Sequence, residues 1–225
     1  MCGITGVIVK KNEYYASNVY RNLLLASQIR GQDGTGITRL RDSEFLTKKW
    51  DSKASDIVFS DDFNEVLDLK IGDKVIGQNR YATFGLEHSN DQPLVTNRFA
   101  LVHNGVLYDY EKQFEKYNVR RELKVDTELI LRLIERCYTS YYANESIKDI
   151  MTYFEGEAAC LLLVKPFIKD YQEPSMIAFM KNKILYSGED QFGNIYFFST
   201  LYIKNKVPQI CKNIYEFKNY DVIEY

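Results

Sequence analysis

Several short runs of this chain are hydrophobic at consecutive positions, and that pattern constrains the fold more than any other feature. One run is Ile4–Val9, and the C-terminal third holds others at Ala158–Val164, Met176–Met180, Ile184–Tyr186 and Ile195–Phe198. A strand with one face in water alternates apolar and polar side chains, whereas a strand covered on both faces is apolar throughout. We therefore expect β-sheets that are buried on both sides.

Amphipathic segments supply helices that could cover such sheets. Apolar residues recur at helical spacing within residues 16–29, and a further helix is expected at Ser146–Phe154. The clearest helix begins at Asp126, after which these residues share one apolar face: Leu129, Ile130, Leu133, Ile134 and Cys137. This periodicity is typical of helices that pack one side against a core.

The remaining segments predict short strands, one capped helix and a loop. We expect strands at Ile37–Leu40, Glu44–Trp50, Lys74–Asn79 and Phe99–His103. Ser60 can cap a short helix that runs to Leu69, because serine oxygens accept hydrogen bonds from the first N–H groups of a helix. The polar stretch Thr83–Asn97 is typical of a loop. Without a linker or an internal repeat, residues 1–225 are expected to form one domain with helices and two packed sheets.

The composition argues against several functional classes. Twenty-nine basic and 31 acidic residues give a formal charge of -2, which does not favour nucleic-acid binding. No apolar run has the length of a membrane span, and no export signal is visible. The cysteines Cys2, Cys137, Cys160 and Cys211 lie far apart, without metal-ligand spacing. We expect a cytoplasmic protein with no cofactor, no metal, no nucleic-acid partner and no membrane partner.

Cys2 is a candidate catalytic residue because of its position in the chain. Removal of Met1 would leave a thiol and a free α-amine on one residue. The amine titrates near 7.7–8.0 and the thiol near 8.5, so the amine can accept the thiol proton near neutral pH. This is the logic of an N-terminal nucleophile. Alone, the position is equally compatible with an ordinary cysteine at the start of a buried strand.

Five short blocks carry a family resemblance. They are Met1–Val7 (MCGITGV), Arg30–Gly36 (RGQDGTG), Arg80–Gly85 (RYATFG), His103–Gly105 (HNG) and Asp126–Glu128 (DTE). In order and approximate spacing they resemble class II glutamine amidotransferases, whose members include the glutaminase domains of amidophosphoribosyltransferase and glucosamine-6-phosphate synthase. The resemblance covers essentially the whole chain. It implies an α+β fold, a four-layer α-β-β-α sandwich of the N-terminal nucleophile hydrolase type, and hydrolysis of the glutamine side-chain amide through a Cys2 thioester.

The resemblance also implies roles at the reacting centre. The Asn104 side-chain amide and the Gly105 backbone N–H would hold the oxyanion of the tetrahedral intermediate. From the residues alone, Asn104–Gly105 could equally be a simple turn at the end of a strand. His103 is expected to be structural rather than the base, since the α-amine of Cys2 can serve.

Further residues would bind the substrate. By resemblance, Arg80 binds the α-carboxylate of glutamine and Asp126 binds its α-ammonium. A solvated charge at a strand end is the alternative for Arg80, and a helix N-cap is the alternative for Asp126. Tyr81 and Thr83 belong to what the family uses as a loop over the bound substrate.

Arg30 and Gly31 would shape the glutamine pocket. Their alternative is a glycine stop at a helix C-terminus with a basic last turn. Cys137 and Cys160 are expected in the core. Some relatives have His where this chain has Ile29, so the branch of the family stays open.

The expected product is ammonia, and its acceptor is not apparent in the sequence. We expect residues 1–225 to be a glutaminase domain without an acceptor or synthase domain, so that a separate synthase or transferase protein takes the ammonia. Two alternatives remain: a catalytically silent scaffold that binds glutamine or a partner, and an amidohydrolase that acts on another γ-glutamyl amide. Substrate profiling separates the second from a glutaminase, and a retained Met1 would favour the first because it removes the free amine.

Overall fold

The structure, a computed structural model, describes residues 2–81, 90–166, 173 and 175–225. Its strands are β1 (Gly3–Ile8), β2 (Gly34–Arg41), β3 (Glu44–Trp50), β4 (Lys74–Arg80), β5 (Leu94–Val95), β6 (Phe99–Leu107), β7 (Gly156–Val164), β8 (Met176–Lys181), β9 (Tyr186–Glu189), β10 (Ile195–Phe198), β11 (Lys212–Glu216) and β12 (Val222–Glu224). Its α-helices are α1 (Glu13–Ser27), α2 (Ala54–Ile57), α3 (Asp61–Val66), α4 (Tyr110–Tyr117), α5 (Thr127–Cys137), α6 (Ala143–Tyr153) and α7 (Tyr202–Lys206).

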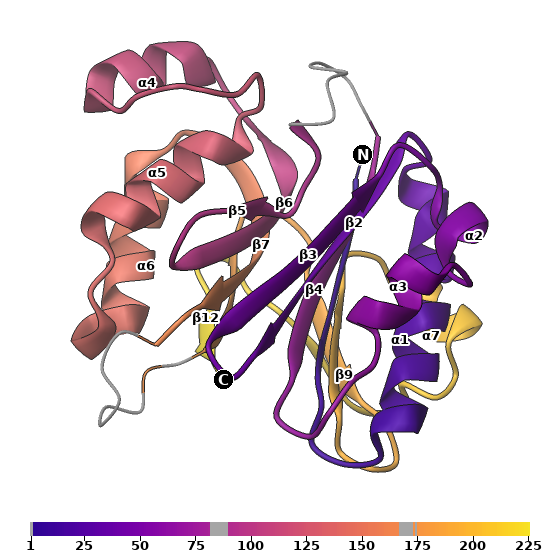
Figure 1. The fold of residues 1–225 in the computed structure, drawn as a ribbon. Helices are drawn as coiled ribbons and strands as arrows, with labels where there is room; N and C mark the ends of the chain where they lie inside the picture. The colour runs from indigo at the N-terminus through magenta and orange to yellow at the C-terminus, as the bar shows by residue number, and fades with distance from the viewer. Residues whose placement is uncertain (1, 82–89, 167–172, 174) are drawn as a thin grey trace.

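The strands form two antiparallel sheets that lie face to face (Figure 1). The first has the order β11-β9-β10-β1-β4-β2-β3, and the second has the order β12-β8-β7-β6-β5. Helices α1, α2, α3 and α7 cover the outer face of the first sheet, and α5 and α6 cover the outer face of the second. The observed arrangement is the expected four-layer α-β-β-α sandwich.

Three hydrophobic clusters fill the spaces between these four layers. The middle cluster lies between the sheets and contains Ile4 and Ile76 from the first sheet and Val102 and Leu161 from the second. The other two clusters join each sheet to its own helices. Because both faces of the central strands are buried, their sequences are apolar at consecutive positions, as predicted. Each fully buried Leu or Ile contributes about 1.5–3 kcal/mol relative to an exposed one.

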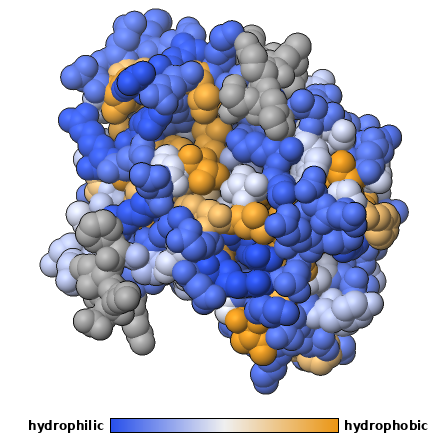
Figure 2. Space-filling model, in the orientation of Figure 1, coloured by the Kyte–Doolittle hydropathy of each residue, from blue (hydrophilic) through white to orange (hydrophobic). Residues whose placement is uncertain are grey.

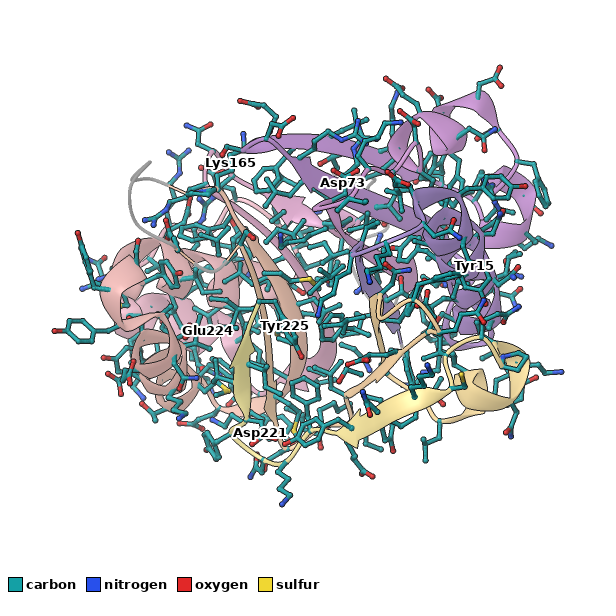
Figure 3. The ribbon with its side chains drawn as sticks, turned by 90° about the horizontal axis from the view of Figure 1, so that it is seen from below. Tyr15, Asp73, Lys165, Asp221, Glu224 and Tyr225 are labelled. Carbon is teal, nitrogen blue, oxygen red and sulfur yellow. The ribbon has the colours of Figure 1, made fainter. Side chains whose placement is uncertain are left out.

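The C-terminus closes one end of the space between the sheets. The Tyr225 ring packs edge-on against Phe197 with centroids 5.2 Å apart, and the Tyr225 backbone exchanges hydrogen bonds with Met176. Figure 3, which views the molecule from below, shows Tyr225 in the middle of this end. The N-terminus lies toward the opposite end (Figure 1), which leaves that end of the inter-sheet space for the site around Cys2.

Most predicted elements are confirmed, with instructive exceptions. The strand expected at Phe99–His103 continues to Leu107, so Asn104–Gly105 lies inside a strand and the turn alternative is wrong. The stretch expected to be a loop contains β5, and residues 82–89 of it lie outside the described residues. Helices α2, α4 and α7 and strands β11 and β12 were not anticipated, and the strand expected at Ile184–Tyr186 begins only at Tyr186, as β9. In the part of the chain that the structure describes, no helix combines the length and apolarity needed to cross a membrane.

Candidate active site

A cavity of about 370 Å³ opens at the end of the inter-sheet space nearest the N-terminus. Its described lining comes from β1, β4, β6, α4 and the segments before β5 and α5: Cys2, Gln78, Arg80, Tyr81, Asn90, Gln92, His103, Gly105, Val106, Leu107, Tyr110, Lys124, Val125 and Asp126. Figure 2 shows hydrophobic side chains gathered on the face below α4. The volume suits a ligand of amino-acid size with both polar and apolar groups.

Cys2 lies at this cavity because β1 pairs with β4. The register Gly3↔Asn79 brings the start of β1 beside the end of β4. The Tyr81 N–H donates to Cys2 Sγ at 3.4 Å, and the thiol lies 3.7 Å from the Tyr81 carbonyl oxygen as a donor. Burial raises the pKa of the Cys2 thiol, and the Tyr81 N–H partly offsets that rise. A thiol in this setting stays protonated at neutral pH and needs a base.

The exposed edge of β6 presents backbone groups to the cavity. The N–H of His103 donates to Gln92 Oε1 at 2.5 Å, and the N–H of Leu107 donates to Asp126 Oδ2 at 2.9 Å. Both N–H groups therefore point away from β7. N–H groups two residues apart in an antiparallel strand point to the same side. The Gly105 N–H consequently lies on this edge between the other two, facing the cavity that Gly105 lines.

Gly105 cannot carry a side chain in this position. A Cβ on Gly105 would overlap the backbone of Glu157 in the neighbouring strand β7 and would lie 2.5 Å from His103 Nε2. Asn104 is buried, and alternation along β6 places it on the inter-sheet face with Val102. It is not among the described residues that line the cavity, whereas its neighbour Gly105 is.

Arg80 lines the cavity from the end of β4 as a buried, paired cation. Its Nη1 donates to Asp91 Oδ1 at 2.5 Å, and the two side chains are 9% and 3% exposed. The alternative of a solvated charge at a strand end is therefore wrong. Asp91 holds the guanidinium at the wall of the cavity.

Asp126 lies at the N-cap position of α5 without capping the helix through its side chain. Its Oδ2 instead accepts the Leu107 N–H, and its Oδ1 lies 3.8 Å from His103 Nδ1. The carboxylate is thus turned toward β6 and the cavity. This orientation places a negative charge where a substrate ammonium could reach it.

The other residues expected to bind substrate occupy different places. Tyr81 lines the cavity mouth with half of its side chain exposed, and Thr83 lies outside the described residues. Arg30 and Gly31 do not line the cavity: Gly31 packs behind the end of β4, where a Cβ would lie 2.6 Å from Tyr81 N. Arg30 ends the short helical turn after α1, and Gly31 follows it in an extended conformation, so the turn ends without the left-handed glycine of the glycine-stop alternative.

The structure adds Gln78, Asn90, Gln92 and Lys124 to the lining, and the sequence analysis did not select them. Gln78 Nε2 donates to the His103 carbonyl at 2.8 Å, and Asn90 Oδ1 accepts the Lys124 N–H at 2.8 Å. The available signal was the polar run Asn90–Gln92 in the middle of an expected loop. The hydrogen-bond partners of these residues lie in distant parts of the sequence, so the sequence alone indicated no function for the run.

Comparisons with known proteins agree with the class of enzyme that this site geometry indicates. Residues 78–202, more than half of the chain, match the family described as "Glutamine amidotransferase domain". The chain belongs to the glutamine amidotransferases of class II, and its fold is that of the N-terminal nucleophile type.

Relatives of known function are longer than this chain. It is 29% identical over 190 residues to glutamine–fructose-6-phosphate aminotransferase (isomerizing) of Bacillus cereus, covering 81% of this chain and 29% of that protein. The same enzyme of Streptococcus mutans is 31% identical over 192 residues with the same coverage. This chain therefore spans about three-tenths of the length of these relatives.

A solved structure shares the fold. Glutamine phosphoribosylpyrophosphate amidotransferase from B. subtilis, complexed with ADP and GMP, superposes with a TM-score of 0.72 at 22% identity, covering 98% of this chain and 49% of that one. This likeness confirms the predicted architecture.

Proposed function

We propose that the protein hydrolyses the side-chain amide of glutamine, with Cys2 as the nucleophile after removal of Met1. The observation that carries the proposal is the convergence on one cavity of Cys2 before β1, Arg80 at the end of β4, Gly105 in β6 and Asp126 before α5. Each supplies a different part of the reaction: a thiol, an N–H donor, a cation and an anion. Family membership supports the same reaction class.

The reaction begins with proton transfer from the Cys2 thiol to its own α-amine. The thiolate attacks the amide carbon, and the carbonyl oxygen becomes an oxyanion held by the Gly105 N–H and the Asn104 amide. The α-ammonium returns its proton to the departing nitrogen, and ammonia leaves a γ-glutamyl thioester. Water then attacks the thioester, which releases glutamate and the free thiol. The raised pKa of the buried thiol explains why an intramolecular base is required.

Substrate selectivity would come from opposite charges on the two walls. Arg80 faces the α-carboxylate, and the Asp126 carboxylate faces the α-ammonium. Tyr81 and Thr83 would cover the substrate, while Arg30 and Gly31 support the end of β4 from behind. We assign no cofactor or metal to this chemistry, since every step uses a side chain or backbone group of this chain.

The ammonia would pass to a separate synthase or transferase protein. Two apolar side chains at the cavity, Tyr81 and Val106, are 54% and 56% exposed. Large exposed apolar patches mark contact surfaces for other proteins, and these two side chains would contribute to such a surface at the cavity. Glutamine labelled with ¹⁵N at the amide tests this step, because transfer puts the label in the acceptor product, and its appearance only as free ammonia would contradict it.

Intact mass before and after 6-diazo-5-oxonorleucine tests the nucleophile and the pocket together. We expect a mass without Met1 and a single adduct that peptide mapping places on Cys2. Cys2→Ala should show no adduct, and Cys211→Ala, which changes an exposed cysteine, should react like the natural protein. A retained Met1 without an adduct would favour the binding scaffold. Faster turnover of another γ-glutamyl amide than of glutamine would favour the second alternative.

A further inference from the structure

A closed set of hydrogen bonds lies at the wall of the cavity, which Gln92 and His103 line. Gln92 Nε2 donates to Thr127 Oγ1 at 2.7 Å, and Thr127 Oγ1 lies 3.1 Å from His103 Nδ1. His103 in turn places Nε2 3.2 Å from the Glu157 carbonyl, and its backbone N–H returns to Gln92 Oε1 at 2.5 Å. All three side chains are at least nine-tenths buried.

The direction of every proton in this ring follows from one carbonyl. The Glu157 oxygen can only accept, so His103 Nε2 carries a proton, and in this tautomer Nδ1 is an acceptor. That Nδ1 accepts the Thr127 hydroxyl proton, which leaves the Thr127 oxygen to accept from the amide nitrogen of Gln92. The Gln92 oxygen then faces the His103 N–H. The ring therefore has a single consistent polarity.

The ring connects β6, which carries Gly105, to the start of α5, which follows Asp126. His103 precedes Asn104–Gly105, and Thr127 follows Asp126, which itself holds the Leu107 N–H. The β6 edge is thus fixed at His103 by Gln92 and at Leu107 by Asp126. Among the described residues of this edge, the Gly105 N–H lies between these two fixed points and faces the cavity.

We propose that Gln92, Thr127 and His103 are positioning residues that hold the Gly105 N–H and the Asp126 carboxylate in register for the reaction. This inference rests on the proposed glutaminase function. The ring acts by fixing the β6 edge against the start of α5. Its effect should be large, because misplacing one oxyanion donor costs about 100-fold to 1,000-fold in kcat.

Thr127→Val is the direct test, since it keeps the shape and removes the hydroxyl that joins Gln92 to His103. We expect kcat with glutamine to fall by about 10-fold to 100-fold, and Thr127→Ser should restore most of it. Alkylation of Cys2 by iodoacetamide, which needs no oxyanion donor, should stay within about twofold. Thr38→Val is the matched control, because Thr38 is a buried threonine in the first sheet, where it hydrogen bonds Thr47 of the neighbouring strand β3. Equal losses of kcat in Thr127→Val and Thr38→Val would overturn the proposal.

Gln92→Glu provides a second variant if Thr127→Val does not fold. A carboxylate can still accept the His103 N–H but cannot donate to Thr127, so the ring breaks at one bond and kcat should again fall. Unchanged kcat in this variant would contradict the positioning role.

Nitrogen NMR of the natural protein tests the ring without any activity. The chain has two histidines, and His88→Gln assigns the signals. We expect His103 Nε2 to carry a proton, and an Nε2 without a proton would overturn the ring. If the natural protein does not hydrolyse glutamine while this signature is present, the proposed function fails and the ring stands.

Discussion

Arg80 and Asp91 form a buried ion pair at the wall of the cavity, with Arg80 Nη1 donating to Asp91 Oδ1 at 2.5 Å. Asp91→Ala would leave the guanidinium buried without this carboxylate. Breaking a buried pair in this way costs about 3–5 kcal/mol of unfolding free energy, measurable by urea denaturation. Glutamine should stabilise the variant more than the natural protein, since its α-carboxylate replaces part of the missing charge.

The control for this prediction is an ion pair at the surface. Lys48 Nζ lies 2.9 Å from Asp62 Oδ1, and the Asp62 side chain is 63% exposed. Asp62→Ala should cost less than about 1 kcal/mol. Similar losses for the two variants would show that burial of Asp91 contributes nothing to stability.

Asp126→Asn separates the charge of Asp126 from its structural hydrogen bond. An asparagine oxygen can still accept the Leu107 N–H, so we expect the fold and the β6 edge to persist. Loss of the charged partner for the substrate ammonium should raise KM for glutamine by about 10-fold to 100-fold, as a charged hydrogen bond contributes about 1.5–3 kcal/mol. Glutaramate, which lacks the α-amine, should be turned over equally by both proteins. An unchanged KM for glutamine would exclude Asp126 as the ammonium partner.

Gly31→Ala should disturb the end of β4 from behind. The new methyl group would overlap the Arg80 backbone and lie 2.6 Å from Tyr81 N. Such overpacking typically costs about 1–3 kcal/mol, and the shift of Arg80 and Tyr81 should lower kcat/KM. Gly34→Ala is the matched control, because its methyl group would meet its nearest neighbours at 3.4 Å, an ordinary contact. Thermal melting and glutamine kinetics of both variants check this, and equal effects would contradict it.

Cys2 should react slowly with iodoacetamide at neutral pH. Burial raises its pKa above the ordinary thiol value, so the thiolate fraction at pH 7 is smaller than for an unperturbed thiol. The rate should rise about tenfold per pH unit and level off only above about pH 8.5, the usual thiol pKa. Peptide mapping follows Cys2, with exposed Cys211 as the comparison in the same molecule. A plateau at or below pH 8 would contradict the direction of the shift.

Much of the architecture was predictable because local pattern and burial agree. The apolar runs of β1, β7, β8 and β10 indicated strands covered on both faces, and periodicity located α1, α5 and α6. Helix α4 was missed because the strand before it was expected to end at His103, whereas β6 continues to Leu107 and α4 begins at Tyr110. Strand β11 was missed because its residues are mostly exposed, so burial left no periodic signal in them.

The candidate site was predictable only in part. Cys2 could be singled out because its chemistry depends on its position in the chain. The sequence alone could not decide between a turn and a strand for Asn104–Gly105, since the same dipeptide suits both. Pairing of β6 with β7 resolved it.

The sequence by itself determined which groups the chain carries and which segments bury their side chains. Periodicity depends on neighbours a few residues apart, so it can be read along the chain. Only the tertiary structure decided that Asp91 pairs with Arg80, that Asp126 binds the Leu107 N–H, and that Gln92 joins β6 to α5. These contacts depend on strand register and on the packing of separate layers, and no local pattern encodes such distances.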